Sequence, residues 1–162
     1  MHILITGVPA TGKSTFARWL AAEHGYVRCP SGEEPNPSTF LADIDRARKM
    51  SANVVIDWGF PPSQLNEVRS LIASGVEPWW FDGDREAALH AFLARKGHPA
   101  TKADWDAQLR NVEEHWDELA ITFEGRILDV VFPGPVHLSN EERWERIECR
   151  RDASLSDEGG RP

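Results

Sequence analysis

The sequence predicts an α/β protein in which one parallel β-sheet lies between two layers of helices. Five short segments with strand signals, most of them apolar, alternate along the chain with segments of helical periodicity. The first run leads directly into a glycine-containing turn that opens a helix. Because consecutive parallel strands are usually joined by helical crossovers, this alternation favours a three-layer α/β/α arrangement. The length of 162 residues, with about 41% apolar composition, suits one globular domain.

The first half of the chain contains three predicted strands and three predicted helices. The strands are 2–6, 26–28 and 53–57, and the helices are 13–24, 38–50 and 64–73. The first strand ends at Gly7, and Gly25 just past the first helix is a typical C-cap. The third strand is a β-branched run closed by Asp57, and Ser63 is placed to cap the helix that follows.

The second half contains two more predicted strands and three more helices. The strands are 76–81 and 127–132, and the helices are 84–95, 105–120 and 140–149. Asp84 caps the first of these helices, and Ser139 with Glu142 forms a capping box at the last. Trp79 and Trp80 are neighbours on one strand, so their side chains should face opposite sides of the sheet. Residues 150–162 are polar without periodicity, and we expect a disordered tail there.

Composition argues against several classes of protein. The formal net charge is −8 and no basic patch is visible, so we expect no nucleic-acid partner. No apolar run approaches the roughly 20 residues of a membrane span, and the N-terminus lacks the features of a signal peptide. The two cysteines, Cys29 and Cys149, do not form a CxxC pair or imply a disulfide. We therefore expect a cytoplasmic protein without a membrane anchor; the oligomeric state is left open.

The segment from Gly7 to Ser14 matches the phosphate-binding pattern GxxxxGK[ST] at every fixed position. Glycines let the backbone curl so that its N–H groups point inward, and the helix N-terminus adds a positive dipole end. The motif predicts bound ATP, with Lys13 reaching the β- and γ-phosphates and the Ser14 hydroxyl as a Mg²⁺ ligand. The predicted nucleotide contacts here are Gly7, Pro9, Ala10, Thr11, Gly12, Lys13, Ser14 and Thr15. The alternative is a strand–helix turn that binds nothing.

Asp57 is the second candidate for the metal site. An Asp that ends a strand next to such a loop often holds Mg²⁺, usually through water. An Asp is also common where a strand closes into a turn, here Gly59-Phe60-Pro61-Pro62 after Trp58. Together with the phosphate motif, the position favours the metal role.

The motif, the segment Asp57-Trp58-Gly59-Phe60-Pro61 and the strand that leads to Asp84 together resemble the nucleoside monophosphate kinase-like P-loop kinases. That group includes adenylate, shikimate and gluconate kinases, with zeta-toxin and chloramphenicol phosphotransferase proteins as relatives. The resemblance covers residues 1–149. It implies the P-loop NTPase fold, a kinase domain over 1–149, the strand order 2-3-1-4-5 and a short lid at about 96–103. Trp58 is one residue more than the Asp-Gly-Phe-Pro segment of adenylate kinases contains.

The resemblance also assigns roles outside the phosphate motif. Arg95 occupies the position of the arginine that begins the lid, so it would contact the transferring phosphate as a catalytic residue beside Lys13 and Asp57. A helix C-terminal arginine favoured by the helix dipole is the other interpretation. Lys102 or Arg110 could supply a second lid cation. The loop over 133–137 would lie near adenine, with contacts from Gly134 and Val136.

By the same resemblance, the acceptor would lie between the end of the second strand and the next helix. The candidate residues there are Arg28, Ser31, Glu33, Glu34, Asp45, Arg46 and Lys49. Glu33, Asp45 and Asp57 are each possible general bases, and Trp58 is a possible pocket wall. Three functions stay open: a small-molecule kinase that phosphorylates a hydroxyl or phosphate acceptor, a nucleoside monophosphate kinase, and a non-catalytic nucleotide-binding regulator. The first is favoured, because Trp58 and the short segment 29–50 disfavour the second.

Overall fold

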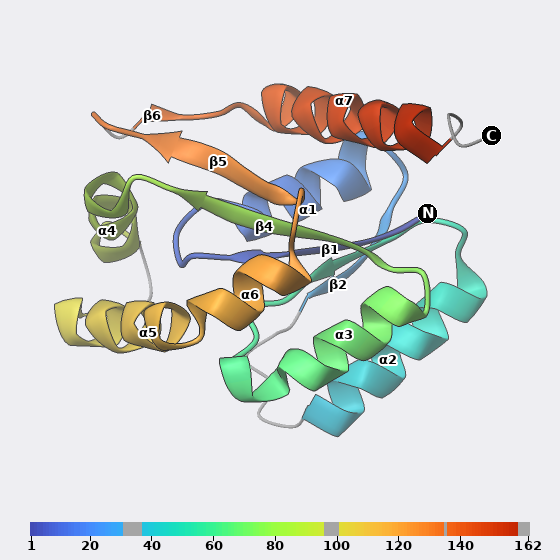
Figure 1. The fold of residues 1–162 in the computed structure, drawn as a ribbon, viewed down its shortest axis with the longest axis horizontal. Helices are drawn as coiled ribbons and strands as arrows, with labels where there is room; N and C mark the ends of the chain where they lie inside the picture. Colours follow the sequence, from blue (N-terminus) through green and yellow to red (C-terminus); the bar gives the residue numbers. More distant parts are fainter. Residues whose placement is uncertain (31–36, 96–100, 135, 159–162) are drawn as a thin grey trace.

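A six-stranded sheet forms the centre of the computed structural model, which describes residues 1–30, 37–95, 101–134 and 136–158 (Figure 1). The strands are β1 (His2–Gly7), β2 (Val27–Pro30), β3 (Val54–Asp57), β4 (Glu77–Gly83), β5 (Ile127–Phe132) and β6 (Val136–His137). Their order in the sheet is β2-β3-β1-β4-β5-β6. The first five are parallel, as predicted, in the predicted order. The sixth was not predicted; it is two residues long and pairs antiparallel with β5.

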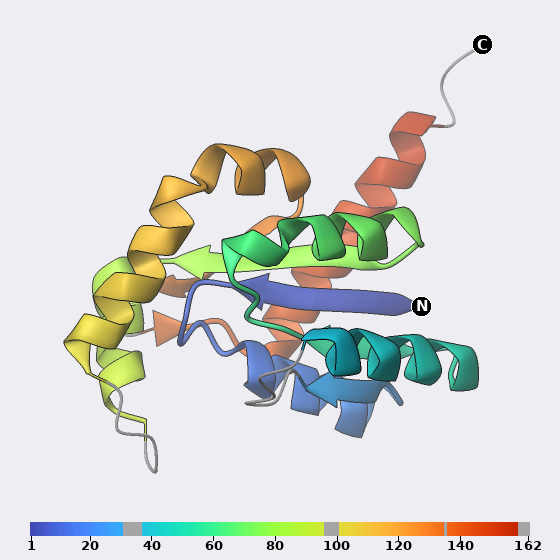
Figure 2. The ribbon, with the colours of Figure 1, turned by 90° about the horizontal axis from the view of Figure 1, so that it is seen from below.

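Helices cover both faces of this sheet. They are α1 (Lys13–Glu23), α2 (Pro37–Met50), α3 (Leu65–Ala73), α4 (Arg85–Leu93), α5 (Lys102–Glu114), α6 (Trp116–Thr122) and α7 (Asn140–Glu158), with a 3₁₀ turn η1 at Pro62–Gln64. Helices α1 and α7 lie over one face, and α2, α3, α5 and α6 lie over the other (Figure 1). The view from below shows α2, α3, α5 and α6 spread in front of the strands (Figure 2). The predicted three-layer architecture is confirmed.

The core consists of two apolar clusters, one on each face of the sheet. Trp79 belongs to the cluster under α1 and α7, whereas Trp80 belongs to the cluster under α2, α3, α5 and α6. The expected alternation is therefore present, and both indoles are buried. Trp58 is also buried, with its ring centroid 5.2 Å from that of Phe40 and 5.6 Å from that of Phe60. It packs as a core residue.

Two predicted helix boundaries were wrong. The segment expected as one helix over 105–120 forms α5 and α6, which meet at His115, a residue outside helical geometry. The segment 150–158, expected as part of a disordered tail, continues α7 to Glu158. The Arg151 side chain explains part of this extension, because its Nε donates to the Glu77 carboxylate on β4 at 2.7 Å. Charged residues on the outer side of α7 hid its periodicity.

Two of the three predicted N-caps are confirmed, but Ser63 lies inside η1 and does not cap α3, whose N-cap is Gln64. Asp84 accepts from the Ala87 N–H at 2.8 Å, and Ser139 and Glu142 form the reciprocal capping box. Of the expected lid, 96–100 lie outside the described residues, and 101–103 open α5, where Thr101 is the N-cap. None of the described helices is long and apolar enough to cross a membrane. Both cysteines are free thiols.

Candidate functional site

The loop between β1 and α1 has a backbone that depends on two glycines. Gly7 has φ of 122°, and a Cβ there would lie 2.1 Å from the Phe81 carbonyl oxygen on β4. Gly12, the N-cap of α1, has φ of 83°. Ala10 also has a positive φ, of 60°, which side chains rarely adopt. The loop therefore holds a curled shape that few sequences could adopt, which is the shape the phosphate motif predicts.

Two hydrogen bonds hold the loop in shape, and neither of them involves an N–H group of α1. The buried Thr11 hydroxyl donates to the Val8 carbonyl at 2.8 Å, and the Val8 N–H donates to the Phe81 carbonyl at 2.9 Å. No side chain caps α1, since its N-cap is Gly12. The N-cap residue therefore supplies no side-chain acceptor to the first N–H groups of the helix, and with the helix dipole these groups favour an anion.

The Lys13 ammonium lies across the loop that precedes it. It donates to the Gly7 carbonyl at 3.0 Å and to the Val8 carbonyl at 2.7 Å. Burial lowers the pKa of Lys13 to about 8, a shift that Asp57 opposes and Arg95 increases. A bound phosphate would stabilise the charged form, so the site favours an anion beside this ammonium.

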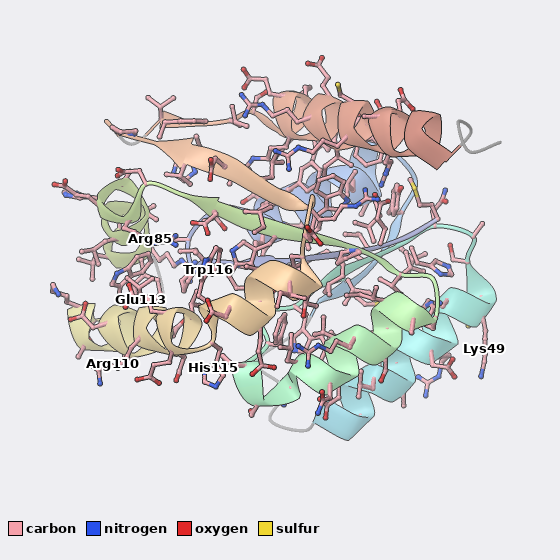
Figure 3. The ribbon with its side chains drawn as sticks, viewed as in Figure 1. Lys49, Arg85, Arg110, Glu113, His115 and Trp116 are labelled. Carbon is pink, nitrogen blue, oxygen red and sulfur yellow. The ribbon has the colours of Figure 1, made fainter. Side chains whose placement is uncertain are left out.

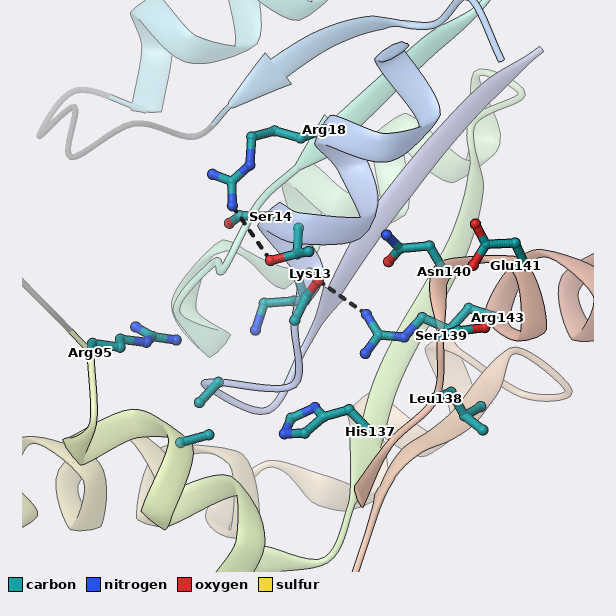
Figure 4. Close-up of a pocket in the computed structure, with 14 residues that line it drawn as sticks. Lys13, Ser14, Arg18, Arg95, His137, Leu138, Ser139, Asn140, Glu141 and Arg143 are labelled. Atoms are coloured by element: carbon teal, nitrogen blue, oxygen red, sulfur yellow. Dashed lines mark hydrogen bonds between the residues drawn. The ribbon is translucent and has the colours of Figure 1, made fainter. Parts of the chain in front are cut away.

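A cavity of about 750 Å³ opens beside the loop and is lined by cations from three parts of the chain (Figure 4). Lys13 and Arg18 come from α1, Arg95 follows α4, and Arg143 comes from α7. Among the described lining residues, Glu141 is the one carboxylate. A positively charged cavity in a chain of net charge −8 indicates a site for an anionic ligand.

The predicted residues of the loop largely line this cavity. Those that do are Ala10, Gly12, Lys13, Ser14 and Thr15. The Thr15 hydroxyl accepts a hydrogen bond from Arg18 Nη2 at 3.4 Å. Gly7, Pro9 and Thr11 shape the loop from behind and are not among the lining residues.

Asp57 lies at the carboxyl end of β3, next to β1 in the sheet, with Ile5 as its register partner. Its carboxylate is buried and pairs with the Arg28 guanidinium on β2 at 2.5 Å. It does not line the main cavity, but its charge acts on the Lys13 ammonium. The structure thus places Asp57 beside the loop, with a cation bound to it that the sequence did not indicate.

Arg95 reaches the cavity from the end of α4, as the predicted lid arginine would. Its guanidinium carbon lies 5.0 Å from the centre of the Phe92 ring, and burial lowers the pKa of Arg95. In Figure 4 the Arg95 side chain extends from the backbone that follows α4 toward Lys13 and the loop. Lys102, by contrast, pairs with Asp106 on α5 at 2.7 Å and is not among the lining residues.

The two residues predicted to contact adenine, Gly134 and Val136, do not line the main cavity. Gly134 lines a separate cavity of about 230 Å³ with Asp84 and His90, and Val136 is exposed on β6. The segment from His137 to Asn140 lines the main cavity instead. Strand β6 pairs antiparallel with β5, and the residues from its end onward line the main cavity.

Comparison with known proteins finds similar structures but no similar sequences. No known family model and no curated protein matches the chain. The solved structures that resemble it include a gluconokinase from Sinorhizobium meliloti 1021 (19% identity, TM-score 0.58, covering 87% of this chain and 85% of that one). They also include a deoxyadenosine kinase from M. mycoides with bound dATP (14%, 0.60, 94% and 100%) and a shikimate kinase from Bacteroides thetaiotaomicron (14%, 0.53, 98% of each). The chain has the P-loop kinase fold that these structures share.

Proposed function

We propose that the protein is an ATP- and Mg²⁺-dependent kinase that transfers the γ-phosphate to a small molecule through a hydroxyl or phosphate acceptor. One observation carries the proposal. The curled loop from Gly7 to Ser14 opens at the N-terminus of α1 onto a cavity in which the Lys13 and Arg95 cations face one another. Backbone N–H groups, a helix dipole and converging cations are what a triphosphate requires.

Two residues would act on the transferring group. Lys13, now bound to two loop carbonyls, would exchange them for phosphate oxygens when the nucleotide binds. Arg95, at the end of α4, would stabilise the charge that spreads over the γ-phosphoryl oxygens in the transition state. Because the pKa of Lys13 lies low without an anion, phosphate binding would raise it and keep the ammonium charged.

Mg²⁺ would be held by the Ser14 hydroxyl and, through water, by the Asp57 carboxylate. These are oxygen ligands, which Mg²⁺ prefers, and it keeps several waters when bound to phosphates. No group of three or more acidic, His or Cys side chains among the described residues could hold a metal ion. The nucleotide would thus supply part of the coordination, and the ion would neutralise charge on the β- and γ-phosphates.

The acceptor site is proposed near the carboxyl ends of β2 and β3, beside Asp57. Glu33, Glu34 and Ser31 lie outside the described residues. The candidates on α2 are engaged in pairs on the exposed side of that helix: Arg46 with Asp43 at 3.0 Å, and Lys49 with Asp45 at 2.6 Å. Of the candidate bases, Asp57 is the described carboxylate at this edge of the sheet, and it would have to leave its pair with Arg28 to accept the proton of an acceptor hydroxyl. We further propose that the protein acts in the cytoplasm, with neither nucleic acid nor membrane as a partner.

An ATP-consumption assay with Mg²⁺ tests the proposal against panels of sugars, sugar acids, nucleosides, nucleotides and hydroxylated compounds. We expect turnover with one class, lost by at least about 100-fold in Lys13→Ala while circular dichroism stays unchanged. Arg69→Ala is the control, because that exposed arginine on α3 pairs with Glu118 on α6 and does not line the cavity. Turnover only with nucleoside monophosphates would select the second function. Wild-type activity in Lys13→Ala would contradict the proposal.

A further inference from the structure

Arg143 is a buried cation that the proposed function does not use. It lies in the first turns of α7, just after the Ser139–Glu142 capping box, and only 3% of its surface is exposed. Figure 4 shows its guanidinium directed toward the start of α1, on the side of the cavity away from Arg95. Residues so buried and charged are rare unless something pairs with them.

The guanidinium is packed directly on the phosphate loop. Its Nη1 donates to the Gly12 carbonyl at 3.2 Å, and a Cβ on Gly12 would lie 2.8 Å from that nitrogen. Its central carbon lies 5.6 Å from the centre of the Phe81 ring. The second fixed glycine of the motif therefore gives Arg143 the room to approach the loop.

The hydrogen-bonding capacity of Arg143 is largely unused. Its buried Nε has no partner, and no carboxylate of the described residues lies within ion-pair distance. Glu142 acts on it only at longer range, since that carboxylate accepts from the Ser139 N–H at 2.7 Å. A guanidinium has five N–H donors, and the one hydrogen bond of the Arg143 guanidinium among the described residues is that to Gly12, while the residue lines the cavity.

The surroundings of Arg143 raise the free energy that is needed to keep its guanidinium charged. Burial lowers the pKa of Arg143 to about 10. The N-terminus of α1 presents its positive dipole end to the same place, and Lys13 and Arg18 line the same cavity. An unpaired buried cation is unfavourable, and an anion at this point would remove the penalty.

We propose that Arg143 binds the phosphate chain of the nucleotide, as a fixed cation that α7 presents to the phosphate loop. The inference rests on the proposed function and assigns it a residue outside the motif. Two phosphate oxygens fit the planar, two-pronged donor pattern of a guanidinium, and the loop N–H groups around Gly12 would bind the same phosphate. Arg143 is thus a binding residue, expected to act on nucleotide affinity more than on the chemical step.

Inorganic tripolyphosphate with Mg²⁺ is the direct probe, because it has the phosphates and lacks the base. We expect calorimetry to show binding to the wild-type protein, weakened about 10- to 100-fold in Arg143→Met. The dependence of affinity on salt should also become weaker, since one charge contact is lost. Arg146→Met is the matched control: that arginine lies one turn further along α7, over the Phe132 ring, and is not among the residues lining the cavity.

Each outcome decides between the two proposals. Failure of the wild-type protein to bind tripolyphosphate and ATP overturns both. Loss of binding in Lys13→Ala with full binding in Arg143→Met overturns only the role of Arg143. Loss of ATP affinity in Arg143→Met with unchanged tripolyphosphate affinity also overturns it, since the residue would then act on the base. If Arg143→Met does not fold, Arg143→Lys decides: a several-fold loss of tripolyphosphate affinity supports the role, and wild-type affinity contradicts it.

Discussion

The Arg28 guanidinium on β2 lies 2.5 Å from the carboxylate of Asp57 on β3, at the edge of the sheet where the phosphate loop begins. The carboxylate that we assign to Mg²⁺ is therefore already neutralised by a side chain from the neighbouring strand. The ion and the guanidinium would share this carboxylate or compete for it. Several predictions in this region depend on which groups surround Asp57.

Removing the Arg28 guanidinium should strengthen the binding of Mg²⁺ to Asp57. In Arg28→Gln, we expect the Mg²⁺ concentration for half-maximal ATP turnover to fall several-fold, because Asp57 loses its competing cation. Without Mg²⁺ the variant should be less stable by about 1–3 kcal/mol, since a largely buried carboxylate is left unpaired. A titration of ATP turnover with MgCl₂ measures the first effect, and urea unfolding without Mg²⁺ measures the second. Arg46→Gln, at an exposed pair on α2, should change neither.

Neutralising the carboxylate should have the opposite effect on the ion. In Asp57→Asn, we expect about a tenfold or greater rise in the Mg²⁺ concentration needed for turnover, since a charged oxygen ligand is lost. Titration of activity with MgCl₂ at saturating ATP measures it. The control is Asp45→Asn, on the outer side of α2. An unchanged Mg²⁺ titration in Asp57→Asn would remove this residue from the metal site.

Nucleotide affinity should depend on pH through Lys13. Its pKa is lowered to about 8 in the free protein, and phosphate binding should raise it. Below pH 8 the ammonium is charged in both states, so affinity should be constant; above pH 8 binding must take up a proton, so affinity should fall. Calorimetry with ATP from pH 7.5 to 9.5 tests this. In Lys13→Arg the affinity should be lower at pH 7.5 and nearly flat across the range, and a flat profile for the wild-type protein would contradict the assignment.

The same linkage makes a prediction for folding stability. Between about pH 8 and the ordinary Lys value of 10.5, the unfolded chain binds more protons at Lys13 than the folded protein does. The contribution of Lys13 to the free energy of unfolding should therefore rise with pH across this window and be constant below it. Urea unfolding of the wild-type protein and Lys13→Met at pH 7.5 and 9.5 isolates it. A difference between the two proteins that does not change with pH would contradict the lowered pKa.

Two alanine substitutions distinguish the effect of the Arg143 contact at Gly12 from the effect of backbone strain alone, because Gly25 has a similar positive φ but no neighbour. Gly12→Ala introduces a side chain at φ of 83° within 2.8 Å of Arg143, so we expect lower stability and at least about tenfold weaker ATP binding. Gly25→Ala has φ of 67° and open space, and should lose about 1–2 kcal/mol of stability without a change in ATP affinity. Thermal unfolding and calorimetry on both variants make the comparison. Equal ATP affinity in the two variants would show that the contact with Arg143 is unimportant for binding.

Local sequence signals predicted the parts of the site that are contiguous in the chain. The loop from Gly7 to Ser14 carries its own glycines and helix start, so its shape and position followed from eight adjacent residues. Strands β1, β3 and β4 were visible as apolar runs because both of their faces are buried. The strand order was implied by the resemblance to P-loop kinases, and the structure confirms it.

Contacts between distant residues were not predictable in this way. Arg143 and Gly12 are 131 positions apart, and neither the helix pattern of 140–149 nor its capping box shows which arginine turns inward. The pairing of Arg28 with Asp57 depends on the strand register. The antiparallel strand β6, which contains Val136, was not predicted, because a strand of two residues leaves no periodic signal. Figure 3 shows how the side chains crowd between the layers, where such pairings are decided by packing.

A crystal structure grown with Mg²⁺ and a non-hydrolysable ATP analogue tests the central claim most directly. The account predicts the β-phosphate within hydrogen-bond distance of backbone N–H groups between Gly7 and Ser14, with Lys13 moved from the Gly7 carbonyl to the phosphates. A nucleotide whose phosphates lie outside this loop, with Lys13 still bound to the loop carbonyls, would contradict it.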